Sequence, residues 1–369
     1  MTYLGIERAI LAVQDAQQPV GTIPALEYAA ASTAAREIIS AAFPAAAARI
    51  DAMAARFETM TTPIERIRAQ QAGRAAATMV LAGRDDDQWC TVVDESVIAL
   101  GGGTTARGNQ QSPWLAAAPF ALKNVAQFDV RLPYWTTIDG TNVPDPLIVR
   151  ATIFDKVDRL TPPREIAQFW SGSPVVAWNQ VAQTVSAACG LSVAERAHVL
   201  AVVNVAIADA TLATLHQQRL SRNGQPQWRE RLVPTDEPPA AADVTLTNDA
   251  SGEFQAYRLD ARPVITPPLR RYPSLAAAVA SAACAALGGV PNIGHVPFEL
   301  SPVDRTGVAG ASRRKFSNIG EAARECAYAA SASLDNSREA CVAGYYFGVD
   351  IGRYVLKRMP PTSASRVRQ

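Results

Sequence analysis

Alanine dominates the apolar residues of this 369-residue chain, and aromatic residues make up only 7% of it. Alanine has the highest intrinsic helix propensity, and its small side chain lets neighbouring helices approach closely. Hydrophobic residues account for 48% of the chain, which is close to the average of folded domains and is not typical of a disordered protein. The sequence therefore predicts an all-α fold, with enough residues for one large domain or two medium ones.

Capping and breaking residues predict where the helices begin and end. Apolar residues recur at helical spacing across 5–82, whereas Pro, Asn and Asp make 114–162 irregular. Helices resume at about 163, where Thr161 can cap a segment that opens with two prolines. Three further helix starts are predicted at Ser192 with Glu195, at Pro273 with Ser274 and at Asn318 with Glu321. The helix that starts at Ser274 is predicted to end at Gly288, and a last helix is predicted over about 337–357.

We expect these helices to form one compact unit with four parts along the chain. One stretch departs from helical spacing: residues 244–247 and 253–257 alternate in polarity around a turn-forming segment, which predicts a small β-hairpin at about 240–260. The four parts are an N-terminal helical part (1–112), an irregular connecting segment (113–162), a helical core that contains the hairpin (163–358) and a tail (359–369).

Charge and composition exclude several classes of partner. The formal net charge is +1 and no basic stripe is present, so we expect no nucleic-acid binding. The N-terminus lacks a basic region followed by a long apolar run, which predicts no signal peptide and a cytoplasmic location. The apolar run of 275–290 is mostly alanine and ends at two glycines, as in a buried helix, so no membrane span is expected. Five scattered cysteines and three distant histidines predict reduced thiols and no metal site.

Three segments carry a resemblance to a known family. They resemble, in order and spacing, the helix before the first anion-binding motif, the Tyr-Pro-Ser-Gly-His segment and the Ser-Arg-x5-His-x3-Asp motif of bacterial vanadium-dependent haloperoxidases and PAP2-type acid phosphatases. The resemblance extends to about residue 355. It implies the helical bundles of that superfamily, and it is compatible with a homodimer because its members are often oligomeric. The segments are 204–210, preceded by Phe169-Trp170 and Trp178-Asn179, then 266–276 and 336–350.

The family's chemistry requires positive charge around an oxyanion. Lysine and arginine side chains neutralise vanadate or phosphate, serine and glycine donate hydrogen bonds, one histidine coordinates vanadium or attacks phosphorus, and a second acts as acid or base. A multiply charged anion needs this compensation when it is partly removed from water. By position, the lysine of the family falls on Gln218 and its first arginine on Gln225. Pro273 and Ser274 are retained, whereas the glycine and the acid–base histidine fall on Leu275 and Ala276.

The last motif likewise lacks the family's cationic and imidazole side chains. Its serine and arginine fall on Glu339 and Ala340, its metal-binding histidine falls on Tyr346, and only Asp350 is kept. Each lost charge-assisted hydrogen bond is worth about 1.5–3 kcal/mol. The resemblance therefore implies a member of the fold that has no vanadate cofactor and does not cleave phosphomonoesters.

Five side chains are candidates for a different chemistry. Glu339, Tyr346 and Asp350 are spaced by seven and four residues and share one helix face. Tyr346 could supply a phenolic proton while a carboxylate orients it. Ser274 lies at a helix start, where backbone N–H groups could hold a carbonyl oxygen. His216 precedes the former lysine position by two residues and could approach the rim of the pocket.

Each candidate also has a structural alternative. Tyr346 could fill the space that the oxyanion leaves, Asp350 could be a buried partner of the backbone or of an arginine, and His216 could be a surface residue. His198, inside an apolar helix, is interpreted as a core residue with a satisfied hydrogen bond. The hairpin segment could be a lid or a surface decoration.

Two functional classes stay open at this point. The first is an enzyme repurposed for cofactor-independent acid–base chemistry, such as a cyclisation, isomerisation or rearrangement of a small organic metabolite. The second is a non-catalytic binding or scaffolding protein. Residual haloperoxidase or phosphatase activity is a third option, and it would need Arg219, Arg271 or Arg338 to rebuild the anion site, although a shift of one residue turns a helical side chain by about 100°.

Overall fold

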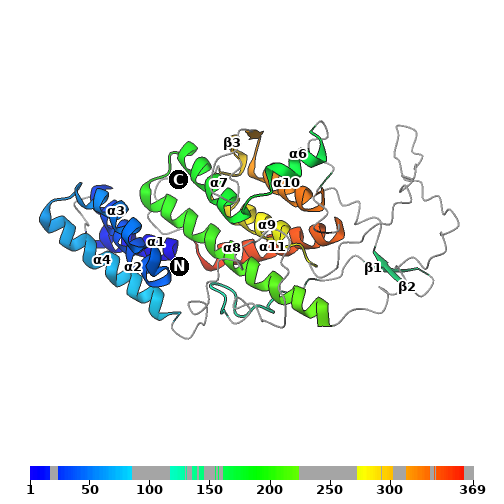
Figure 1. Ribbon diagram of the computed structural model, residues 1–369, viewed down its shortest axis with the longest axis horizontal. Helices are drawn as coiled ribbons and strands as arrows, with labels where there is room; N and C mark the ends of the chain where they lie inside the picture. Colours follow the sequence, from blue (N-terminus) through cyan, green and yellow to red (C-terminus); the bar gives the residue numbers. More distant parts are fainter. Residues whose placement is uncertain are drawn as a thin grey trace.

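Helices make up most of the described chain, in agreement with the predicted all-α class (Figure 1). The structure is a computed structural model. The predicted hairpin, the acidic run at 85–87 and Gln225 lie outside the residues that it describes. Those are residues 1–16, 24–84, 117–128, 135–138, 141–144, 161–223, 272–291, 293–301, 313–332 and 338–360, together with 130, 154, 157 and 336.

The N-terminal residues form a bundle of helices at one end of the molecule (Figure 1). A capping box starts the last of these helices, because the Thr62 hydroxyl accepts from the Glu65 amide and the Glu65 carboxylate accepts from the Thr62 amide across 2.8 Å. The elements are α1 (Thr2–Ala16), α2 (Pro24–Ala42), the short 3-10 helix η1 (Pro44–Ala46), α3 (Ala47–Glu58) and α4 (Pro63–Ala82).

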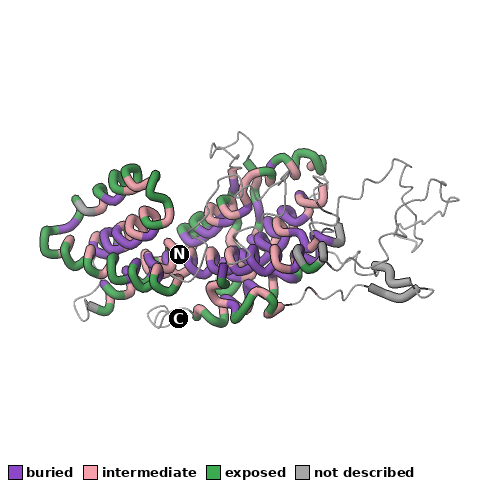
Figure 2. Tube along the Cα trace, turned by 60° about the horizontal axis from the view of Figure 1, so that its bottom comes forward, coloured by how far each residue is buried: buried purple, intermediate pink, exposed green. Residues whose placement is uncertain are grey.

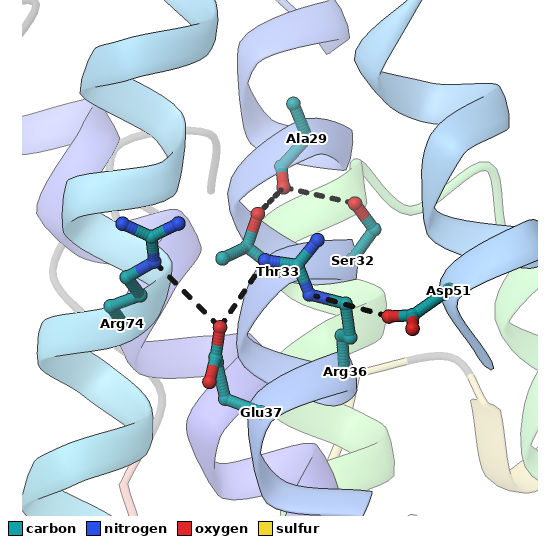
Figure 3. Close-up of polar contacts among 7 residues, drawn as sticks. All are labelled: Ala29, Ser32, Thr33, Arg36, Glu37, Asp51 and Arg74. Atoms are coloured by element: carbon teal, nitrogen blue, oxygen red, sulfur yellow. Dashed lines mark hydrogen bonds and ion pairs between the residues drawn. The ribbon is translucent and has the colours of Figure 1, made fainter. Parts of the chain in front are cut away.

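Polar contacts join α2 to its two neighbours on the surface of this bundle (Figure 3). Arg36 of α2 reaches Asp51 of α3 across 3.9 Å, and Glu37 of α2 reaches Arg74 of α4 across 3.7 Å. Exposed ion pairs contribute at most about 1 kcal/mol each. The interior, which is built from small apolar side chains such as Ala30 and Ala69, therefore accounts for most of the packing energy.

The long helix α8 (Val193–Asn223) runs through the core of the molecule (Figure 1), where buried residues concentrate (Figure 2). Residues 193–218 of α8 are long and apolar enough to cross a membrane and include an 18-residue window with a mean hydropathy of 1.7, but 78% of that window lies buried inside the protein. Its apolar character is explained by the helices that pack against it, which are α1 of the bundle together with α7 (Pro174–Ala188), α9 (Leu275–Leu287) and α11 (Arg338–Arg358). Two further helices complete the core: α10 (Ile319–Ala332) packs against α9, and α6 (Pro163–Phe169) packs against α10.

Most predicted helix starts are confirmed, and one cap is wrong. Ser192 and Glu195 form a capping box, Ser274 caps α9, and Asn318 accepts from the Glu321 amide at the start of α10. α6 begins at Pro163 as predicted, but its N-cap is Pro162 and not Thr161, so no side chain caps this helix. The Thr161 hydroxyl instead accepts from Arg314 across 3.3 Å.

Two short antiparallel sheets were not predicted. The first lies within the segment interpreted as irregular, where β1 (Trp135–Ile138) pairs with β2 (Thr141–Pro144). In the second, β3 (Phe298–Leu300) follows the 3-10 helix η7 (Ile293–His295) and pairs with β4 (Arg314–Phe316). Strands of three or four residues contain too few alternations to give a period-two signal.

Candidate functional site

The three segments that carry the family resemblance meet in the core, where they hydrogen-bond directly to one another. Gln218, near the end of α8, is 7% exposed, and its Nε2 donates to the Pro273 carbonyl across 2.7 Å. The Ser274 amide donates to the Ala340 carbonyl of α11 across 2.9 Å. The end of α8, the start of α9 and the first turn of α11 are therefore joined through groups that lie at or beside the former anion-binding positions.

Ser274 has a structural role at this junction. Its side chain is fully buried, and its hydroxyl accepts from the Ala277 amide across 3.4 Å as the N-cap of α9. The Ser274 amide is already bonded to Ala340, so neither of these two amides is free to hold a carbonyl oxygen. Leu275 and Ala276, which stand at the glycine and histidine positions of the family, are half-buried in the first turn of α9.

Glycines on α11 bring that helix into backbone contact with α9. Gly344 lies against Ser274 and Gly348 against Ala278, so the two helices run side by side in the same direction. A methyl group added at Gly344 would lie 2.4 Å from the Ser274 carbonyl oxygen, well inside van der Waals contact. Only glycine therefore permits this spacing, and the close approach of the helices closes the space between these residues.

Tyr346 and Asp350 lie on a different face of α11 from this contact. Tyr346 follows Gly344 by two residues, which corresponds to about 200° around a helix. The Tyr346 side chain is 37% exposed, and Asp350, one turn later, is exposed as well. Glu339 belongs to α11, but its side chain is outside the described part of the molecule. Tyr346 therefore lies on a different side of α11 from the side that packs against Ser274.

The two histidines of α8 do not face the junction of Gln218 with Pro273. His216 is half-buried, and about 200° of helix rotation separates it from Gln218, which faces α9. His198 was interpreted as a satisfied core residue, and this is confirmed: its Nδ1 lies 2.6 Å from Oε1 of Glu7 on α1. This contact links the N-terminal bundle to the core and involves no candidate site residue.

The residues described at the family's anion-binding positions do not fit a multiply charged oxyanion. At these positions Gln218 supplies a neutral donor that is already used, while Ala276 and Ala340 supply no side-chain donor. A tetrahedral oxyanion needs cationic or N–H donors that point at it, whereas the Gln218 side-chain amide and the Ser274 backbone amide are both bonded to carbonyl oxygens of the chain. The side chains of Arg219 and Arg338, and all of Arg271, lie outside the described residues.

Within the described residues, no three His, Cys, Asp or Glu side chains converge as a metal site would require. The four cysteines that the structure describes are not joined in disulfides. A shallow hollow between α1 and α8 is lined by Tyr3, Phe120, Asn204 and other residues, and it lies apart from the Ser274 junction.

Asp209 lies within the 204–210 segment, and its sequence context predicted no role for it. Its buried carboxylate accepts from the amides of Phe120, Ala121 and Leu122 at 2.6, 2.8 and 2.9 Å. Burial raises the pKa of the Asp209 carboxyl, and the three amide donors and Arg84 act against that rise. Asp209 thus fastens the 117–128 segment to α8. A single carboxylate in the apolar middle of α8 was the available signal for such a role.

A second buried carboxylate was also missed. Glu325 of α10 accepts from Trp170 Nε1 across 2.9 Å and pairs with Arg314 of β4 across 2.6 Å. The same helix carries Arg324, which lies beside the Tyr345 phenol of α11. No local sequence pattern identifies either group, because their partners come from distant segments.

Comparison with known proteins reveals the fold. No protein-family model and no curated protein sequence matches the chain. Among solved structures, a bacterial vanadium-dependent iodoperoxidase is similar over 97% of this chain and 89% of its own, with a TM-score of 0.62 and 16% identity. The holo form of a bacterial vanadium-dependent chloroperoxidase is similar over 97% and 91%, with a TM-score of 0.57 and 12% identity. The chain therefore has a vanadium haloperoxidase-like fold, as the motif resemblance implied, and its sequence is highly divergent.

Proposed function

We propose that this chain, whose fold is vanadium haloperoxidase-like, binds no vanadate and catalyses cofactor-independent acid–base chemistry on a small organic molecule. The observation that supports this most strongly is the pair of hydrogen bonds from Gln218 to Pro273 and from Ser274 to Ala340. They engage donors beside the position where an oxyanion would need them. Releasing such buried groups for an anion would leave carbonyl acceptors without partners, which costs about 1–3 kcal/mol for each group.

The acid–base assignment rests on the outer face of α11. Tyr346 and Asp350 are exposed and one helical turn apart, so a bound molecule can reach both. A phenol near a carboxylate can deliver a proton to a carbonyl or leaving group and recover it in the reverse direction. Ser274 is excluded from this role because its amide and hydroxyl serve the junction of α9 and α11.

A non-catalytic binding or scaffolding protein is the second candidate. The fully buried Ser274 and the close contact at Gly344 favour it, since they close the region where the reaction of the related fold takes place. In a scaffold protein the outer face of α11 would serve only to bind a partner. Replacing the Tyr346 hydroxyl would then not change the rate of proton exchange in a substrate.

Vanadate binding is tested by titrating the full chain with orthovanadate at micromolar concentration and recording ⁵¹V resonances and peroxide-dependent halide oxidation. We expect free vanadate only and no oxidation above the buffer rate. A saturable bound resonance that inorganic phosphate displaces would contradict the proposal and would support residual haloperoxidase or phosphatase activity.

Acid–base activity is tested by proton exchange from D₂O into a panel of small carbonyl compounds, compared between the wild type, Tyr346→Phe and Asp350→Asn. The proposed mechanism predicts exchange that Tyr346→Phe lowers by about 10²-fold or more. Tyr28→Phe is the matched control, because Tyr28 has a similar 37% exposure on the N-terminal bundle. Exchange that is equal in the wild type and Tyr346→Phe would remove the phenol from the mechanism.

A further inference from the structure

Arg324 lies where three core helices meet. It comes from α10, its guanidinium is within hydrogen-bonding reach of the Tyr345 hydroxyl on α11, and Cys284 of α9 is an ionisable neighbour of both. Tyr345 packs against the two apolar clusters of the core. This group of side chains therefore occupies a partly dry position, and it was not among the candidates drawn from the sequence.

The charge of Arg324 is not compensated within the described chain. Other partly buried arginines have oxygen partners: Arg314 pairs with Glu325 at 2.6 Å, and Arg84 donates to the Ala118 carbonyl at 2.8 Å. The Nε of Arg324 is buried without an acceptor, as are those of Arg84 and Arg314, so what distinguishes Arg324 is that no carboxylate or backbone carbonyl partner is found for it among the described residues. A guanidinium that is partly removed from water without an anion is destabilising, so this arrangement is suited to a ligand that supplies the missing charge.

The neighbours of Arg324 are donors or neutral groups at physiological pH. Burial raises the pKa of Tyr345 to about 12, and burial raises the pKa of the Cys284 thiol to about 12 as well. The Tyr345 phenol therefore keeps its proton and can donate it in a hydrogen bond, and Cys284 contributes no competing negative charge.

We propose that Arg324 and Tyr345 bind a carboxylate group of a small organic ligand. The planar guanidinium fork matches a carboxylate in a bidentate arrangement, and the phenol adds one further donor. A single guanidinium balances one negative charge, which favours a carboxylate over a phosphate dianion.

The position of this site relative to Tyr346 suggests what the ligand is. The rings of Tyr345 and Tyr346 meet edge to face, with centroids 5.9 Å apart. A carboxylate held at Arg324 therefore places the rest of a small molecule near the exposed Tyr346 phenol. The identification of this ligand as the substrate rests on the proposed acid–base function, whereas the carboxylate site itself does not.

The binding experiment uses benzoate and its neutral counterpart benzamide, which share a shape and differ in charge. Each is titrated into the ¹⁵N-labelled full chain while the Arg324 Nε–H resonance is followed. We expect a saturable shift with benzoate and none with benzamide. Arg324→Gln should weaken benzoate binding by about tenfold or more, and Arg353→Gln, an exposed arginine of α11, should not. Equal binding of the two probes, or equal binding by wild type and Arg324→Gln, would overturn the site.

Stability provides an independent readout. Because Arg324 has no ion pair among the described residues, Arg324→Gln should keep or raise the unfolding midpoint, whereas Arg314→Gln should lower it. A midpoint for Arg324→Gln that falls as far as that of Arg314→Gln would assign Arg324 a structural role and contradict the site. Arg324→Lys keeps the charge without the planar fork and should bind benzoate several-fold more weakly; unchanged affinity would also contradict the site.

The two proposals fail separately. Benzoate binding should persist in Tyr346→Phe, because that phenol is not part of the carboxylate site. Binding with no effect of Tyr346→Phe on proton exchange would refute only the acid–base function. Proton exchange without charge-dependent benzoate binding would refute only the carboxylate site.

Discussion

Gln218 and Pro273 are 55 residues apart in the chain, and the Gln218 side-chain amide donates to the Pro273 carbonyl across 2.7 Å. Gln218 stands at the position that the motif resemblance aligns with the family's lysine, and its bond satisfies a buried carbonyl just before the start of α9. Gln218→Leu should therefore lower the free energy of unfolding by about 1–3 kcal/mol, because the carbonyl would keep its burial and lose its partner. Urea unfolding of the full chain measures this change.

Gln71→Leu on α4 serves as the control for this prediction. Gln71 is exposed, and its replacement should stay within about 0.5 kcal/mol of the wild type. Equal effects of the two substitutions would mean that the Gln218 bond contributes nothing to the junction of α8 and α9.

Gly344→Ala tests the close contact of α9 and α11. The added methyl group would lie 2.4 Å from the Ser274 carbonyl oxygen, and backbone on both sides prevents an easy adjustment. We expect a loss of about 1–3 kcal/mol in unfolding free energy.

Gly83→Ala is the control, with the opposite expected sign. Gly83 has an ordinary φ of −68°, and an added methyl group would have no neighbouring atom nearer than 3.5 Å, so alanine should stabilise the protein by about 0.4–1 kcal/mol. Thermal unfolding in a calorimeter should show a lower unfolding midpoint for Gly344→Ala and a higher one for Gly83→Ala.

Asp209→Asn tests the carboxylate that holds the 117–128 segment. Asparagine has one acceptor oxygen in place of two, and its NH₂ group would face an amide that now donates to Asp209. The expected loss is about 1–3 kcal/mol in the free energy of unfolding. Amide hydrogen exchange should also accelerate at Phe120, Ala121 and Leu122. Unchanged exchange at these three amides would show that the carboxylate does not hold them.

Glu325→Gln removes the charge that pairs with Arg314. The Trp170 donor can keep an oxygen acceptor, but the Arg314 guanidinium would lose its ion pair with the Glu325 carboxylate. We expect a loss of about 2–3 kcal/mol, below the value for a fully buried pair because the Arg314 side chain retains 18% exposure. Glu37→Gln on the bundle surface is the control, since exposed pairs contribute at most about 1 kcal/mol. The two unfolding midpoints should differ clearly.

The amino-acid sequence by itself determined the helices, most of their ends and the altered motifs. Caps such as Ser192 with Glu195, and the stop at Gly288, act between residues within one or two turns, so they are legible in a short window. The motif resemblance also predicts that the family's lysine, arginine and histidine are replaced, because residue types at a fixed spacing can be compared without coordinates.

Only the tertiary structure decided which groups the remaining polar atoms contact. Ser274 bonds to Ala340, Asp209 to amides almost 90 residues away, and Arg324 lies beside Tyr345. Such pairs depend on how whole helices pack, and the register of α9 against α11 follows from the absence of a side chain at Gly344. Long-range contacts arise from the sum of many weak apolar interactions, and no local pattern encodes that sum.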